Sequence, residues 1–228
     1  MTIKRADTFI YVCNIRAPYY DATVLKESSG TGIFIQKDAK YYLLTAQHIS
    51  QKSSKDTYIY LCDNQQNPCK IMLSQLNASL SWNEHPVADM AVIEIDVASN
   101  PWITSRSFPY SQCDISLSGL NRDAELTTVG FPLSLGVKVK FSPLTFRSHA
   151  ASDVLKILRF DTKTPTDIFF LENPSVGGYS GGPIFDLAYM VSGLMTQNIG
   201  PSKLLGIMHG VAETMACVTP ISYLKDLI

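Results

Sequence analysis

The chain has 228 residues, 46% of them hydrophobic, which is enough for a sizeable core and excludes a disordered protein. Its 19 Lys and Arg balance 20 Asp and Glu, so a net charge of −1 offers no field of one sign for nucleic acid or anionic lipid. No apolar run approaches the roughly 18–20 residues that cross a bilayer, and the first residues lack the apolar stretch of a secretory signal. We therefore expect a cytoplasmic protein with no nucleic-acid or membrane partner.

Short apolar or alternating runs separated by turn residues follow one another along the chain, which is typical of a β-barrel or β-sandwich protein. Helical periodicity appears only weakly, near 152–158 and 221–228, and no helix long enough for a parallel βαβ unit separates the runs. An irregular stretch at about 100–121 suits a crossover between two six-stranded halves. The predicted strands are 9–13, 32–36, 41–45, 57–62, 69–73 and 90–95, then 125–130, 137–141, 155–160, 168–172, 182–185 and 204–208.

The five cysteines are odd in number and sparse, and no pair has the short spacing of a zinc site. Cys62 and Cys69 flank a turn-like segment and could face each other across a hairpin. We favour free thiols over a disulfide between them, as the cytoplasmic expectation requires.

Three segments carry residues suited to nucleophilic catalysis. His48 directly follows the predicted strand at 41–45, Asp89 stands at the mouth of the strand at 90–95, and Ser180 lies inside a glycine cluster at 177–182. A serine hydroxyl needs an imidazole to accept its proton, and the imidazole needs an acceptor on its other nitrogen. The chain order His48, Asp89, Ser180 therefore gives a candidate triad.

The glycines beside Ser180 let the backbone turn its amides toward one point without interference from a Cβ atom. A tetrahedral oxyanion requires at least two such donors. We expect the amides of Gly178 and Ser180 to form the oxyanion hole.

With these motifs the sequence resembles the trypsin/chymotrypsin-like serine proteases, the double-β-barrel family that includes the HtrA-type proteases. Residues 45–48 match the family's Thr-Ala-x-His motif, residues 89–92 its Asp-x-Ala-x motif, and residues 178–183 its Gly-x-Ser-Gly-Gly-Pro motif. The resemblance implies one all-β peptidase domain at 1–228 with two packed six-stranded antiparallel β-barrels and a short C-terminal helix. The N-terminal barrel would span about 1–110 and the C-terminal barrel about 120–228.

The resemblance further implies a serine endopeptidase that acts on peptide or protein through an acyl-enzyme, with His48 as general base, Asp89 orienting it and Ser180 as nucleophile. No metal or organic cofactor is implied. Tyr179 stands where digestive trypsins carry the aspartate that pairs with a newly cut N-terminus, so activation by that ion pair is excluded. Without a zymogen junction, we expect regulation by a partner or ligand, or a narrow specificity.

The specificity pocket differs from that of trypsin. Pro174 stands six residues before Ser180, where trypsins carry the aspartate that selects Lys or Arg. Met208 and His209 belong to the stretch expected to form the pocket wall. Relatives with a histidine in a Gly-x-His stretch read Gln or Glu, but here the histidine comes one residue later, and one residue on a strand changes the face.

Two other functions remain open from the sequence. The same fold could bind an extended peptide by strand addition with its triad misaligned. Residues 178–182 also fit the Gly-x-Ser-x-Gly elbow of α/β-hydrolases, which would make the protein an esterase, although that elbow requires a helix after the serine.

Overall fold

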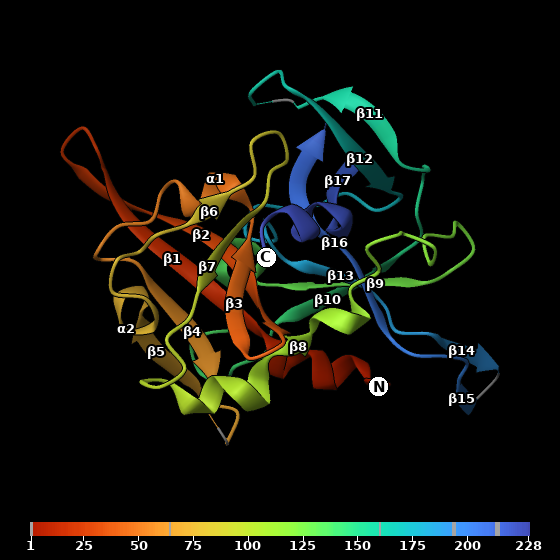
Figure 1. Ribbon diagram of the computed structural model, residues 1–228, viewed down its shortest axis with the longest axis horizontal. Helices are drawn as coiled ribbons and strands as arrows, with labels where there is room; N and C mark the ends of the chain where they lie inside the picture. The colour runs from red at the N-terminus through yellow and green to blue at the C-terminus, as the bar shows by residue number, and fades with distance from the viewer. Residues whose placement is uncertain (1, 64, 160, 193–194, 213–214) are drawn as a thin grey trace.

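The computed structural model describes residues 2–63, 65–159, 161–192, 195–212 and 215–228. Its strands form two large sheets, one from each half of the chain, and the halves lie side by side (Figure 1). Within the described residues, no helix is long and apolar enough to cross a membrane.

The first sheet has the strand order β5-β4-β1-β2-β3-β7-β6, with antiparallel neighbours, and β8 runs parallel beside β2. The long β1–β2 hairpin lies in the middle of this sheet, and its tip projects beyond the rest of the first half in Figure 1. The bounds are β1 Val12–Asp21, β2 Val24–Lys37, β3 Lys40–Thr45, β4 Tyr58–Cys62, β5 Pro68–Met72, β6 Asn83–Glu84, β7 Ala91–Glu94 and β8 Phe108–Pro109.

The second sheet is antiparallel, with the order β10-β9-β13-β16-β17-β12-β11, and a separate hairpin, β14–β15, projects from it. The bounds are β9 Leu126–Gly130, β10 Leu144–Ser148, β11 Leu155–Leu158, β12 Pro165–Leu171, β13 Pro183–Asp186, β14 Tyr189–Ser192, β15 Met195–Asn198, β16 Lys203–Ala212 and β17 Met215–Pro220.

The helices are short. Two are α-helices, α1 Gln47–Ser50 and α2 Leu73–Leu76. The 3₁₀-helices are η1 Arg5–Tyr11, η2 Pro101–Arg106, η3 Tyr110–Gln112, η4 Pro132–Ser134 and η5 Ile221–Asp226.

Strand β2 packs against both halves of the molecule. Ile33 and Ile35 belong to the core cluster that also contains Phe185 and Ile207 of the second sheet. Phe34, between them in sequence, belongs to the separate core of the first half. Successive side chains of a strand point to opposite faces, so β2 packs one face into its own half and the other against its neighbour.

The predicted all-β fold of two antiparallel halves is confirmed. The count of six strands in each half is not confirmed, because among the described residues the first sheet has eight strands and the second has seven. Closed barrels and their boundaries stay a prediction. The C-terminal helix is the 3₁₀-helix η5, and the predicted strand at 9–13 is η1 up to Tyr11. Phe160, in the predicted strand at 155–160, lies outside the described residues.

The cysteine pair lies where a hairpin was predicted, but the register separates the thiols. Strands β4 and β5 pair Leu61 with Cys69 and Cys62 with Pro68. Both thiols are free, and Cys62 Sγ accepts a hydrogen bond from Arg106 Nη1 at 2.9 Å.

Candidate active site

His48 lies in the single turn of α1, directly after β3. The first amides of a helix have no partner within it, and Asp89 supplies one here, because its Oδ1 accepts the His48 N–H at 3.0 Å. The other oxygen, Oδ2, is 2.8 Å from His48 Nδ1. One carboxylate therefore holds both the backbone and the ring of His48, while the His48 side chain keeps 32% of its surface exposed.

Asp89 stands just before β7, and its side chain is fully buried. Burial pushes its pKa upward. The hydrogen bond from the His48 ring and the charges of His48 and His209 outweigh that effect, so the pKa of Asp89 lies below its ordinary value. The group is therefore a carboxylate at neutral pH, as an acceptor for an imidazole must be.

The loop that carries Asp89 is organised by His85, which the sequence analysis did not single out. His85 is only 4% exposed, and its Nδ1 accepts the amides of Val87 and Ala88 at 3.2 and 2.9 Å. Its ring packs on Tyr223 of η5, with centroids 4.7 Å apart. Burial lowers the pKa of His85, which keeps Nδ1 free to accept.

Ser180 lies in a tight loop, residues 177–182, that runs directly into β13; we call this the serine loop. A strand follows the serine instead of a helix, so the structure does not support the α/β-hydrolase alternative. Ser180 Oγ donates to the carbonyl oxygen of His209 at 3.4 Å. Among the described residues, no hydrogen bond joins Ser180 Oγ to His48.

Thr31 of β2 fastens the serine loop to the first half. Its N–H donates to the Ser180 carbonyl at 2.8 Å, and its Oγ1 donates to the Gly178 carbonyl at 2.8 Å. The same Oγ1 accepts the amide of Phe131 at 3.2 Å. On the other side, Gly181 N–H donates to the Met208 carbonyl at 2.7 Å.

The amides of Gly178 and Ser180 donate no hydrogen bond to any other described residue, whereas those of Tyr179, Gly181 and Gly182 all do. Gly178 has φ +102°, a backbone conformation that favours glycine. The Gly177 carbonyl accepts the amide of Leu133 at 2.8 Å. In a trans peptide the N–H points away from the carbonyl oxygen of the same peptide group. The Gly178 N–H therefore points away from Leu133.

The residues predicted to line a specificity pocket divide into two groups. Pro174 and Met208 line a small enclosed cavity of about 10 Å³, together with the Tyr179 side chain. His209 does not line it. Its Nδ1 is 3.1 Å from Asp89 Oδ2, and burial lowers the pKa of His209. Among the described residues, His209 Nδ1 has no hydrogen-bond partner, so this contact is a close approach of the ring to the carboxylate.

Arg159, which no sequence motif singles out, is 2% exposed and reaches the same carboxylate from the second half. Its Nη2 is 3.5 Å from Asp89 Oδ1 and 2.7 Å from Asp161 Oδ2. An arginine between two strands gives no signal of a contact with Asp89 in a sequence, because Asp89 is 70 residues away along the chain.

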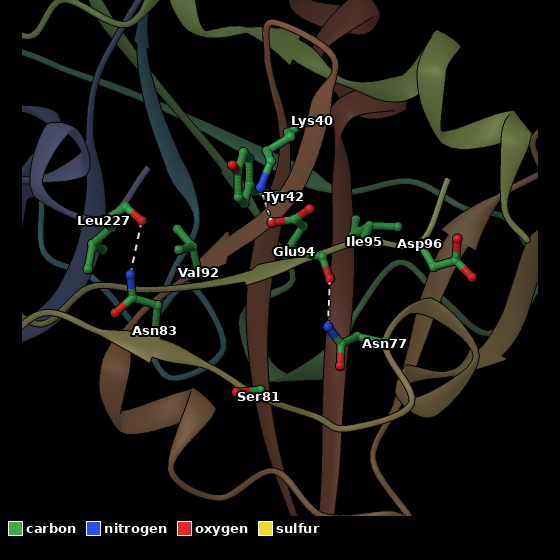
Figure 2. A pocket seen from close by; sticks show the side chains of 10 residues that line it. All are labelled: Lys40, Tyr42, Asn77, Ser81, Asn83, Val92, Glu94, Ile95, Asp96 and Leu227. Atoms are coloured by element: carbon green, nitrogen blue, oxygen red, sulfur yellow. Dashed lines mark hydrogen bonds and ion pairs between the residues drawn. The ribbon is translucent and has the colours of Figure 1, made fainter. Parts of the chain in front are cut away.

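A larger hollow of about 600 Å³ opens on the first half, beside β3 and β7 (Figure 2). It contains none of the predicted site residues, and its polar groups largely pair with the protein itself. Lys40 Nζ lies 2.9 Å from Glu94 Oε2, and Asn83 donates to the Leu227 carbonyl at 2.9 Å. Within the described part of the chain, no three His, Cys, Asp or Glu side chains gather closely enough to hold a metal ion.

Comparisons with known proteins identify the family and the fold of the chain. The family pattern of the trypsin-like peptidase domain matches residues 30–194. Among solved structures, the active form of the Rv3671c protease from M. tuberculosis is 18% identical, with a TM-score of 0.62 over 97% of this chain and 81% of that one. A variant of the HtrA-type protease AlgW with tripeptide is 15% identical, with a TM-score of 0.61 over 98% of this chain. The present chain spans 62% of that AlgW chain. At these identities the structures show a shared fold. No curated protein sequence matches.

Proposed function

Since the chain belongs to the trypsin-like peptidase domain family and is a serine protease, we propose that His48, Asp89 and Ser180 are its catalytic triad. In this mechanism Ser180 Oγ attacks the scissile carbonyl carbon and gives its proton to His48 Nε2. His48 then passes that proton to the leaving amine as the C–N bond breaks. Water, deprotonated by the same imidazole, hydrolyses the acyl-enzyme and restores the Ser180 hydroxyl.

The observation that carries this proposal is the contact of 2.8 Å between His48 Nδ1 and a fully buried Asp89 carboxylate. An acceptor on Nδ1 fixes the neutral imidazole with its proton on that nitrogen, which leaves Nε2 free to accept the serine proton. A buried carboxylate also stabilises the imidazolium more strongly than an exposed one, because water does not screen it.

The free amides of Gly178 and Ser180 support their proposed role as the oxyanion hole. Most backbone amides in a folded protein are paired, so two free donors on one turn are available to a ligand oxygen. They would hydrogen-bond to the negative charge that develops on the carbonyl oxygen during attack.

One contact of the mechanism has to form. Ser180 Oγ points to the His209 carbonyl, and in the proposed mechanism the hydroxyl would turn from it toward His48. Catalytic hydrogen bonds are often long or absent before substrate binds. The same feature keeps a second function open, in which the fold binds an extended peptide without cutting it.

The proposal also covers the barrels, the specificity pocket, the cellular location and the regulation of the enzyme. The two sheets act as two packed barrels with the triad at their junction, and Pro174 and Met208 line the pocket for the residue before the scissile bond. The enzyme works in the cytoplasm on peptide or protein substrates and is restrained by a partner, a ligand or a narrow specificity.

The test is labelling with a serine-reactive fluorophosphonate, combined with turnover of a fluorogenic peptide library. Wild type should label and cleave, while Ser180→Ala and His48→Ala should lose both activities. A folded wild type that binds library peptides but neither labels nor cleaves would replace the protease proposal with the binding module.

A further inference from the structure

Arg159 brings a permanent positive charge into the centre of the site from outside the triad. It lies between β11 and β12 of the second sheet, whereas Asp89 and His48 belong to the first half. With only 3% of its side chain exposed, the guanidinium is shielded from water.

Asp161 fixes the guanidinium in place. Its two carboxylate oxygens accept from Arg159 Nε at 3.0 Å and Nη2 at 2.7 Å, which is the bidentate fork that arginine forms with carboxylates. The hydrogen bond from Arg159 lowers the pKa of Asp161 to about 2, so this partner stays charged.

The third nitrogen of the Arg159 guanidinium, Nη1, contacts the first half. Nη1 lies 2.8 Å from Gln47 Oε1 and 3.4 Å from the Val87 carbonyl. Gln47 and Val87 stand beside the two triad residues in sequence, at one and two residues from His48 and Asp89. Arg159 therefore contacts both segments that carry the His48–Asp89 pair.

The two oxygens of Asp89 have separate partners. Oδ1 accepts the His48 amide at 3.0 Å and faces Arg159 Nη2 at 3.5 Å. Oδ2 faces the ring of His48 at 2.8 Å and that of His209 at 3.1 Å. A carboxylate held on both oxygens cannot rotate away from the imidazole, and a cation beside it opposes the uptake of a further proton by the pair.

We propose that Arg159 is a positioning residue of this protease, which holds Asp89 toward His48 and sets the pH below which the His48–Asp89 pair is inactive. The inference rests on the proposed triad and adds a residue to it. The other charged or titratable groups near the pair are His209 on β16, Asp161 beside Arg159, and Glu84, which accepts from Gln47 at 3.3 Å.

Two variants separate the geometry that Arg159 supplies from its charge. Arg159→Met removes both, and Arg159→Lys keeps the charge but loses the fork. The measurement is the second-order rate constant of fluorophosphonate labelling as a function of pH. Arg159→Met should lower the rate constant on the plateau of the pH profile roughly tenfold, which is the lower end of the loss expected when a hydrogen bond to a charged group is removed. It should also move the acid limb of the profile, where the rate constant falls with decreasing pH, to higher pH. Arg159→Lys should restore the acid limb but not the plateau.

Arg122→Met is the matched control, because Arg122 pairs with Asp153 on the surface. It should label like wild type at every pH. If Arg159→Met does not unfold cooperatively, it is not a folded protein, and labelling of Arg159→Lys and Asp161→Asn then tests the inference. Both should give a lowered plateau.

Folded Arg159 variants with the wild-type plateau and acid limb would overturn the inference and leave the triad intact. A lowered plateau with an unmoved acid limb in Arg159→Met would also overturn it, since a purely structural role explains that result. If wild type fails to label, the proposed function itself fails, and the inference fails with it.

Discussion

Replacing Gly178 by alanine tests the proposed oxyanion hole at one atom. Gly178 has φ +102°, and a Cβ atom built there would lie 2.3 Å from the Phe131 carbonyl oxygen and 3.0 Å from Leu133 N. Real Cβ atoms essentially never approach closer than 3.0 Å, so the loop or the carbonyl must move by 3.0 − 2.3 = 0.7 Å.

Such a shift displaces the amide that would bind the oxyanion. Loss of one donor of this kind costs about 10²- to 10³-fold in kcat. The strained backbone should also lower the free energy of unfolding by about 1–3 kcal/mol. We therefore expect Gly178→Ala to remain folded but to cleave a fluorogenic peptide at least about 100-fold more slowly.

Gly177→Ala is the matched control one residue away, because a Cβ atom there meets no heavy atom within 4 Å and the backbone is not in the left-handed region. It should keep wild-type stability and most of its activity. The assay is kcat/KM on one peptide, with urea unfolding of each variant. A Gly178→Ala enzyme as active as the Gly177→Ala enzyme would refute the assignment of this amide to the oxyanion hole.

Three further predictions concern stability and specificity. Because burial lowers the pKa of His209, stability should be full above the ordinary histidine value of about 6.5 and fall as the pH drops toward the folded pKa. Urea unfolding at several pH values should show a shallower acid loss in His209→Gln, and an unchanged slope would contradict this. The buried Tyr179 hydroxyl has no partner among the described residues, so Tyr179→Phe should leave the free energy of unfolding unchanged or raise it by up to about 1 kcal/mol; a clear loss of stability would count against it. The cavity of about 10 Å³ beside Pro174 and Met208 should admit only small side chains, and a peptide library in which Lys or Phe is preferred before the scissile bond would exclude this pocket.

The sequence was informative where local patterns decide the structure. The apolar run at 32–36 predicted a strand, and β2 contains it, with Ile33 and Ile35 in one core cluster and Phe34 in another. The motif containing Ser180 predicted a tight glycine turn that leads into a strand, which is the serine loop followed by β13. These features depend on neighbours in the chain, so a single sequence carries them.

Contacts between distant segments were beyond reach of the sequence. The sequence did not single out His85, because its role as an acceptor depends on the amides of Val87 and Ala88 folding over its ring. Two partners of Arg159 in the first half, Asp89 and Gln47, lie 70 and 112 residues away along the chain. No local pattern reports a pairing of that kind.

The attachment of the serine loop to Thr31 has a consequence for synthesis of the protein. Thr31 precedes the loop in the chain, but the other anchor of the loop, the Met208 carbonyl, lies on β16, which follows it. A nascent chain that has emerged only as far as Ser180 therefore has the nucleophile without the strand that shapes its loop. The serine loop can therefore take its final shape only after β16 has been synthesised.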